Sequence, residues 1–97
     1  MKTIKTIKNL IQKHKSSLAR QYSVKAVGVF GSYARGNQRE CSDIDILVEF
    51  TKTPDFFKFL RLEKFLKRML GVKVDLVTPK ALKPVLKDMI MKETIFL

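Results

Sequence analysis

The sequence predicts a small α/β domain, in which a mixed sheet of three to four strands is flanked by helices. A chain of 97 residues leaves room for one hydrophobic core, so residues 1–97 are expected to form a single domain. Hydrophobic residues make up 45% of the chain and charged residues 30%, which is a globular composition. Apolar residues recur at helical spacing in some segments and alternate in others. We expect helices over residues 3–20, 55–70 and from Pro79 onward, and strands over residues 24–30, 43–50 and 72–77.

The first helix is predicted by an apolar stripe from which most of the lysines are excluded. The stripe consists of Ile4, Ile7, Leu10, Ile11 and Leu18. His14 lies near this stripe and is the only histidine, so no second imidazole exists to build a metal site. We therefore assign it no chemistry.

The first strand, VKAVGVF, begins at Val24 and ends abruptly at Gly31 and Ser32. Ser32 is typical of a helix N-cap and opens a short helical turn that continues to Arg35. Gly36 then tolerates the positive φ that closes such a turn, and a polar loop follows as far as residue 42.

The second strand, DIDILVEF, alternates so that its isoleucines face one side and its aspartates the other. The next helix begins after Thr53 and Pro54 and stops at Gly71. The third strand, VKVDLV, again carries an aspartate, Asp75, among apolar residues. In the last helix we expect Pro84 to tighten the first turn.

The chain is strongly basic, with 20 Lys and Arg against 9 Asp and Glu and a formal charge of +11. This charge favours polyanions such as nucleotides, nucleic acid or acidic proteins, without choosing among them. Lysines spread over every helix fit a solvated surface equally well. The single cysteine, Cys41, rules out an internal disulfide or a Cys-rich zinc site. No apolar stretch is long enough to cross a membrane, and the N-terminus is too charged for a signal peptide, so we expect a cytoplasmic protein without a membrane partner.

Three aspartates lie on otherwise apolar strands, where an unpaired carboxylate is unfavourable. Asp43 and Asp45 share a face because side chains alternate along a strand. Asp75 joins them only if the second and third strands are neighbours in a compatible register. Such a cluster suits magnesium, which prefers carboxylate oxygens and is often completed by waters and substrate phosphates. Taken singly, each of these acids is as well explained by pairing with one of the many cations.

The bend at Gly31 and Ser32 offers the second half of a site. Glycine permits close approach of the backbone, and the amides that begin the following turn face an anion. Ser32 can donate its hydroxyl to a phosphate oxygen, and Arg35 can add a charge-assisted hydrogen bond. A phosphate beside carboxylates that hold two metal ions implies phosphoryl or nucleotidyl transfer. A Gly-Ser pair alone is uninformative, because turns use both residues widely.

The conjunction of these features resembles the DNA polymerase β-like nucleotidyltransferase superfamily. Its hallmark is Gly-Ser, ten intervening residues and Asp-x-Asp, and residues 33–42 are ten in number here. Within that superfamily, GSYARGNQRECSDIDILVEF and KVDLVTPKALKP look like segments of the minimal nucleotidyltransferases. The resemblance covers residues 22–97 and implies the small polymerase β-like fold.

The resemblance also implies roles for the motif residues. Nucleotide phosphates would be bound by Gly31 and Ser32, beside which the position of Arg35 predicts a further phosphate contact. Magnesium, as two ions, would be bound by Asp43 and Asp45, with Asp75 as the third acid of the metal site. The third acid can also act as general base on the acceptor hydroxyl. Because every motif position is filled, we expect an active enzyme that uses ATP as its substrate.

Members of this size look like the antitoxin half of a toxin–antitoxin pair whose partner is a HEPN-type ribonuclease. They are similar to enzymes that transfer AMP from ATP to a tyrosine of that toxin. We expect the same here, with the partner docking on the last helix or on Ile95–Leu97, a segment that fits the core equally well.

Two alternatives stay open. The chain could be a binding-only antitoxin that neutralises its partner by occlusion. It could also bind RNA directly, although we expect few of its aromatic residues to be exposed and find no recognisable RNA-reading motif. Homo- or hetero-oligomerisation fits a small chain with free strand edges.

Overall fold

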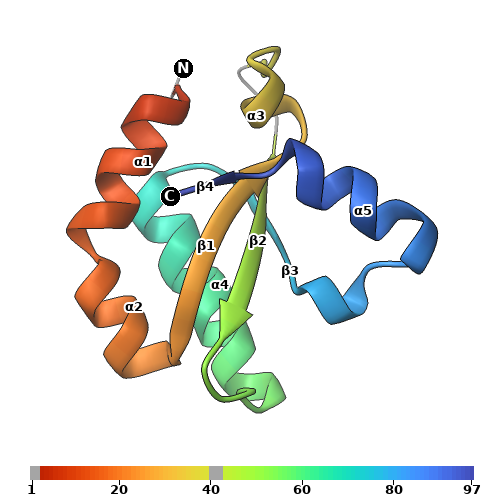
Figure 1. The fold of residues 1–97 in the computed structure, drawn as a ribbon. Coiled ribbons are helices and arrows are strands. Elements are labelled where there is room, and N and C mark those ends of the chain that lie inside the picture. The colour runs from red at the N-terminus through yellow and green to blue at the C-terminus, as the bar shows by residue number, and fades with distance from the viewer. Residues whose placement is uncertain (1–2, 40–42) are drawn as a thin grey trace.

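The structure, a computed structural model, describes residues 3–39 and 43–97. A four-stranded sheet lies at its centre, with α1, α2 and α4 to one side and α5 to the other (Figure 1). In chain order the elements are α1 (Ile4–Lys13), α2 (Lys15–Tyr22), β1 (Val24–Phe30), α3 (Ser32–Arg35), β2 (Ile44–Phe50), α4 (Phe56–Leu70), β3 (Val74–Val77), the 3-10 turn η1 (Pro79–Ala81), α5 (Pro84–Glu93) and β4 (Ile95–Phe96).

The strand order across the sheet is β3-β2-β1-β4. β1 runs antiparallel to both β2 and β4, whereas β2 and β3 run parallel. The parallel pair is possible because α4 carries the chain back across the sheet between β2 and β3. The predicted fold class, a mixed sheet of three to four strands flanked by helices, is confirmed.

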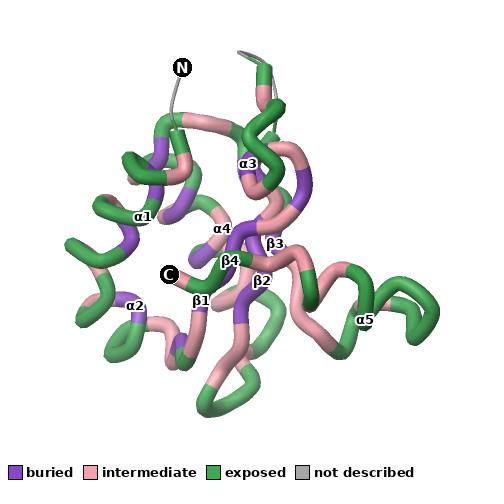
Figure 2. Tube along the Cα trace, turned by 45° about the horizontal axis from the view of Figure 1, so that its top comes forward, coloured by how far each residue is buried: buried purple, intermediate pink, exposed green. Residues whose placement is uncertain are grey.

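One hydrophobic core joins the sheet to the layer of α1, α2 and α4. Burial of this apolar surface is the main stabilising contribution to such a fold. Figure 2 shows the buried positions along the inner sides of these elements. The helices contribute Ile7, Ile11, Leu18, Leu62, Leu66 and Leu70, and the strands contribute Val24, Val27, Val29, Ile44, Ile46, Val48, Val74 and Leu76.

Local capping explains where α4 begins and ends. The Asp55 carboxylate accepts a hydrogen bond of 2.7 Å from the Lys58 amide, so Asp55 is the N-cap. Gly71 ends the helix with a φ of 70°, as expected from the sequence. This helix therefore has the boundaries that its flanking residues predict.

Two predicted helices differ from those observed. The helix expected over residues 3–20 is two helices, which break at His14, where φ is −107° and ψ is 12°. The His14 Nδ1 donates a 3.0 Å hydrogen bond to the Leu10 carbonyl. Periodicity missed this break because the buried stripe continues from one helix to the next.

The last long helix begins at Pro84 and not at Pro79, which opens only η1. A proline at the first helical position needs no hydrogen-bond donor, whereas inside a helix its ring would clash with the preceding turn. The loop residue Cys41 lies outside the described residues. No helix in the described part of the chain is long and apolar enough to span a membrane.

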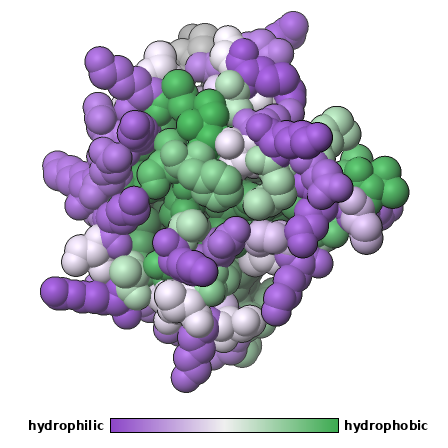
Figure 3. All heavy atoms as spheres, viewed as in Figure 1, coloured by the Kyte–Doolittle hydropathy of each residue, from purple (hydrophilic) through white to green (hydrophobic). Residues whose placement is uncertain are grey.

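The α5 helix has no buried residue, although it lies in the connection between β3 and β4, the two edge strands of the sheet. Several large apolar side chains of α5 and β4 are exposed, and we call them the α5 face: Val85, Leu86, Met89, Ile95 and Phe96. Figure 3 shows hydrophobic side chains around the centre of this view and at the outer end of α5, with hydrophilic ones around them. For residues 95–97 we expected either a docking surface or a place in the core. Leu97 packs against the core, whereas Ile95 and Phe96 are exposed.

Candidate active site

Asp45 and Asp75 lie side by side on neighbouring parallel strands, where they are direct register partners. Asp45 is also the register partner of Phe30, the residue that precedes the Gly31 bend in β1. Asp43 is exposed and comes just before β2 begins. The strand adjacency and register that a shared acid cluster requires are therefore present.

The pKa of the Asp45 carboxyl is raised above its ordinary value of 3.8. The largest cause is desolvation by burial, followed by repulsion from Asp75 and Asp43 and by a side-chain hydrogen bond to Asp75, while Arg35 acts in the opposite direction. Negative charge is thus concentrated at one point of a protein whose formal charge is +11. A cation placed between these carboxylates would relieve their repulsion.

Within residues 3–39 and 43–97, no group of three or more His, Cys, Asp or Glu side chains is arranged closely enough to hold a metal ion by itself. Magnesium seldom needs such a cage, because it keeps several waters and is commonly held by one or two carboxylates together with substrate phosphates. The adjacent carboxyls of Asp45 and Asp75 supply hard oxygen donors of this kind. The donor chemistry therefore fits magnesium.

The bend at Gly31 packs directly against the acid cluster. Gly31 is buried and has a φ of 74° and a ψ of −149°, a backbone conformation that residues other than glycine rarely adopt. A Cβ atom at this position would overlap the Asp45 carboxylate. Only glycine therefore allows the bend and the carboxylate to lie so close together.

The short helix α3 is held in place at both of its ends. The Tyr33 side chain is 2% exposed and belongs to the core, so it anchors the turn that follows the bend. Gly36 closes the turn with a φ of 76°. Ser32 lies half-buried at the start of α3, and Arg35 ends it.

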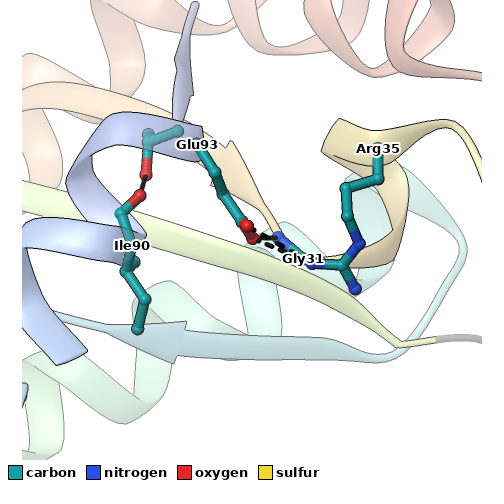
Figure 4. Close-up of polar contacts among 5 residues, drawn as sticks. Gly31, Arg35, Ile90 and Glu93 are labelled. Atoms are coloured by element: carbon teal, nitrogen blue, oxygen red, sulfur yellow. Dashed lines mark hydrogen bonds and ion pairs between the residues drawn. The ribbon is translucent and has the colours of Figure 1, made fainter.

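A residue that the sequence did not suggest, Glu93, reaches this bend from the end of α5 (Figure 4). The Gly31 amide donates a 2.7 Å hydrogen bond to Glu93 Oε1, and Arg35 Nη1 donates to Oε1 at 3.1 Å and to Oε2 at 3.3 Å. An acid in the last turn of a helix opposes the helix dipole and needs a positive partner. That mismatch was the signal in the sequence, although it does not name the partner.

The acid cluster is open to solvent rather than enclosed. Asp43 and Asp75 are exposed, and Asp45 is half-buried. A pocket of about 750 Å³ lies further along the same strands, where Phe50, Phe56 and Phe59 contribute to its lining, and none of the three aspartates lines it. An open site of this kind is accessible to large molecules as well as to small ones.

Comparison with known proteins shows the family to which this chain belongs. Residues 11–97 match the nucleotidyltransferase domain family. The chain is 40% identical over 96 residues to the protein adenylyltransferase MntA of Thermococcus cleftensis, with 99% of this chain and 97% of that protein covered. It is 53% identical over 97 residues to a Methanocaldococcus jannaschii protein provisionally named protein adenylyltransferase MJ0128, with 99% of each chain covered.

Solved structures show the same fold. A structure provisionally described as a minimal nucleotidyltransferase superposes with a TM-score of 0.77 at 36% identity, covering 94% of this chain and 95% of that chain. A chain from a toxin–antitoxin crystal structure with AMP-PNP superposes with a TM-score of 0.70 at 29% identity, covering 88% of this chain and 70% of that chain. From its sequence and its fold, this chain belongs to the nucleotidyltransferase domain family and is a nucleotidyltransferase of the minimal type.

Proposed function

We propose that this nucleotidyltransferase transfers AMP from ATP to a hydroxyl group of a partner protein, a HEPN-type toxin, and thereby acts as its antitoxin. The observation that carries the proposal is the paired Asp45 and Asp75 beside the Gly31 bend. The adenylyltransferase names of relatives at 40% and 53% identity support AMP as the transferred group. The toxin–antitoxin complex with AMP-PNP supports both the nucleotide and the class of partner.

In this proposal the bend holds the triphosphate. The Gly31 amide and the Arg35 guanidinium donate hydrogen bonds to an anion in the structure, and phosphate oxygens accept from the same donors. The Ser32 hydroxyl adds a third donor at the start of α3. These groups would fix the β- and γ-phosphates, so that the α-phosphorus faces the acids.

The acids then act on the acceptor. Asp43, Asp45 and Asp75, together with substrate phosphates, would hold magnesium, which when bound would neutralise charge on the transferring phosphate and make the attacking hydroxyl more acidic. Asp75 is exposed and can take the hydroxyl proton as a general base. The hydroxyl oxygen forms a bond to the α-phosphorus, the bond between that phosphorus and the bridging oxygen breaks, and pyrophosphate leaves.

The acceptor is proposed to be a protein because two acids of the cluster are exposed and because the chain also carries exposed apolar side chains on α5. Within the described residues, α5 has no buried position, and Val85 and Met89 are 87% and 58% exposed. An exposed apolar surface of this kind marks an interaction site. A tyrosine of the docked toxin is the acceptor that the family resemblance implies.

Intact-mass measurement tests the proposal directly. The toxin is mixed with this chain, ATP and magnesium, and we expect it to gain the mass of AMP. Asp45→Asn should abolish the gain, whereas Asp88→Asn, an exposed acid elsewhere on α5, should leave it unchanged. Transfer by Asp45→Asn at the wild-type rate would remove the proposed metal role.

The exposed α5 face also favours a second candidate function, a binding-only antitoxin that occludes its toxin. Both functions require a complex, so complex formation does not separate them. Asp75→Ala does separate them, because an occluding antitoxin still neutralises the toxin without this carboxylate. An adenylylating antitoxin loses neutralisation together with the mass gain.

A further inference from the structure

The Glu93 carboxylate makes the contacts that the proposed function assigns to a phosphate. It accepts the Gly31 amide hydrogen bond at 2.7 Å and two contacts from Arg35 Nη1 at 3.1 and 3.3 Å (Figure 4). A carboxylate and a phosphate are both anionic acceptors, and both pair with amide and guanidinium donors. Two of the three donors proposed for the triphosphate are thus already engaged by a side chain of the same protein.

The fold holds Glu93 at this position from both sides. On the N-terminal side of Glu93 lies α5, of which it is the last residue. The last turn of this helix is stabilised by the Thr94 hydroxyl, which donates a 2.6 Å hydrogen bond to the Ile90 carbonyl. On its C-terminal side β4 pairs with β1, with Phe96 opposite Gly28. A Cβ atom at Gly28 would overlap Thr94, so the two segments approach each other closely.

The position is also unfavourable for an acid unless it is paired. Glu93 is the last residue of α5, where the carbonyl end of the helix repels negative charge. Its side chain is 29% exposed, against 54% for the Arg35 side chain. The contact with the Gly31 amide and the guanidinium compensates this repulsion, so Glu93 remains where a phosphate would bind.

We propose that Glu93 is an internal competitor for the phosphate site, which an incoming triphosphate must displace from Gly31 and Arg35. This inference rests on the proposed function, because that function places the triphosphate at the same donors. Displacement also releases the end of α5 from the bend. Triphosphate affinity is therefore lower than the donors alone would provide.

Binding of inorganic tripolyphosphate to the full chain, measured by titration calorimetry, tests this inference without nucleobase, toxin or transfer. Glu93→Gln keeps an oxygen that accepts from the Gly31 amide but removes the charge that competes with phosphate. We expect it to bind about fivefold more tightly than the wild type, which corresponds to about 1 kcal/mol. Asp88→Asn, with the same change in charge on the same helix, should stay within about twofold of the wild type.

A second readout separates displacement from a general charge effect. In amide NMR spectra, tripolyphosphate should shift the Gly31 and Thr94 signals of the wild-type protein together, because one event both fills the bend and frees the end of α5. In Glu93→Gln the Thr94 shift should be smaller. A wild-type Gly31 shift without any change at Thr94 would overturn the inference.

Equal or weaker binding by Glu93→Gln would also overturn it and would make Glu93 a residue that positions Arg35. The absence of tripolyphosphate binding by both proteins would overturn it as well. Failure of AMP transfer to the toxin, with tighter binding by Glu93→Gln intact, would count against the proposed function and would leave Glu93 supported as a competitor for phosphate.

Discussion

Replacement of Gly31 by alanine tests the contact between the bend and the acid cluster. Its backbone has a φ of 74° and a ψ of −149°, and a Cβ atom would overlap the Asp45 carboxylate. A side chain in this region of φ and ψ costs about 1–3 kcal/mol from backbone strain alone. Displacement of the carboxylate adds to that cost, so we expect the free energy of unfolding to fall by at least about 2 kcal/mol.

Gly36 provides a matched control on the other side of the same short helix. Its φ is 76°, but among the described residues no atom beyond Gly36 and its two chain neighbours lies within 4 Å of the position a Cβ would occupy. Gly36→Ala therefore pays only the cost of a left-handed backbone, about 1 kcal/mol. Alanine restricts the unfolded chain equally in both variants, so this contribution cancels from their difference.

Thermal unfolding followed by circular dichroism measures the difference. In a domain of this size each 1 kcal/mol lowers the Tm by about 4–8 °C, so Gly36→Ala should fall by about that amount and Gly31→Ala by at least about twice as much. Gly31→Ala should also lose AMP transfer, while Gly36→Ala retains it. Equal Tm values, or full transfer by Gly31→Ala, would refute the proposed packing of the bend on Asp45.

Asp45→Asn should stabilise the metal-free protein. The pKa of the wild-type Asp45 carboxyl is raised, so the folded state binds this proton more tightly than the unfolded state does. The stability that the group contributes therefore falls as the pH rises above 3.8. The Tm advantage of the variant over the wild type should therefore grow with pH, and an advantage that shrinks would contradict this cause. Leu66→Ala, at a core position 1% exposed, should lower the free energy of unfolding by about 2–5 kcal/mol in urea titrations, and a loss below about 1 kcal/mol would contradict its central place in the core. Met89→Ser on the α5 face should weaken toxin binding by about fivefold in calorimetry, whereas Asp88→Ser should not, and equal affinities would exclude this face as the docking surface.

Periodicity predicted the central elements well, because their side chains follow the period of their backbone. The alternation in residues 43–50 indicated β2, and it also put Asp43 and Asp45 on the face away from the core. Capping residues determined the ends of α4 in the same local way. The break at His14 and the short strand β4 were missed, since neither changes the local pattern of apolar residues.

The residues of the candidate site also differ in whether a local sequence pattern could predict them. The Gly-Ser pair and the Asp-x-Asp motif lie within one stretch of chain, so their spacing could be recognised directly. The partnership of Asp45 with Asp75 needed the strand order and register of the sheet. Glu93, which is 62 residues from Gly31 in the chain, could not be connected with it from local pattern at all.

The sequence by itself determined the class of the fold, the family and the residues that carry the motif, because backbone periods and short-range spacings are properties of local segments. Only the tertiary structure decided that Asp75 meets Asp45, that Gly31 packs on the same carboxylate, and that Glu93 engages the donors of the bend. These contacts join segments far apart in the chain. They depend on which strands pair and on where the last crossover returns to the sheet, and no local pattern records either.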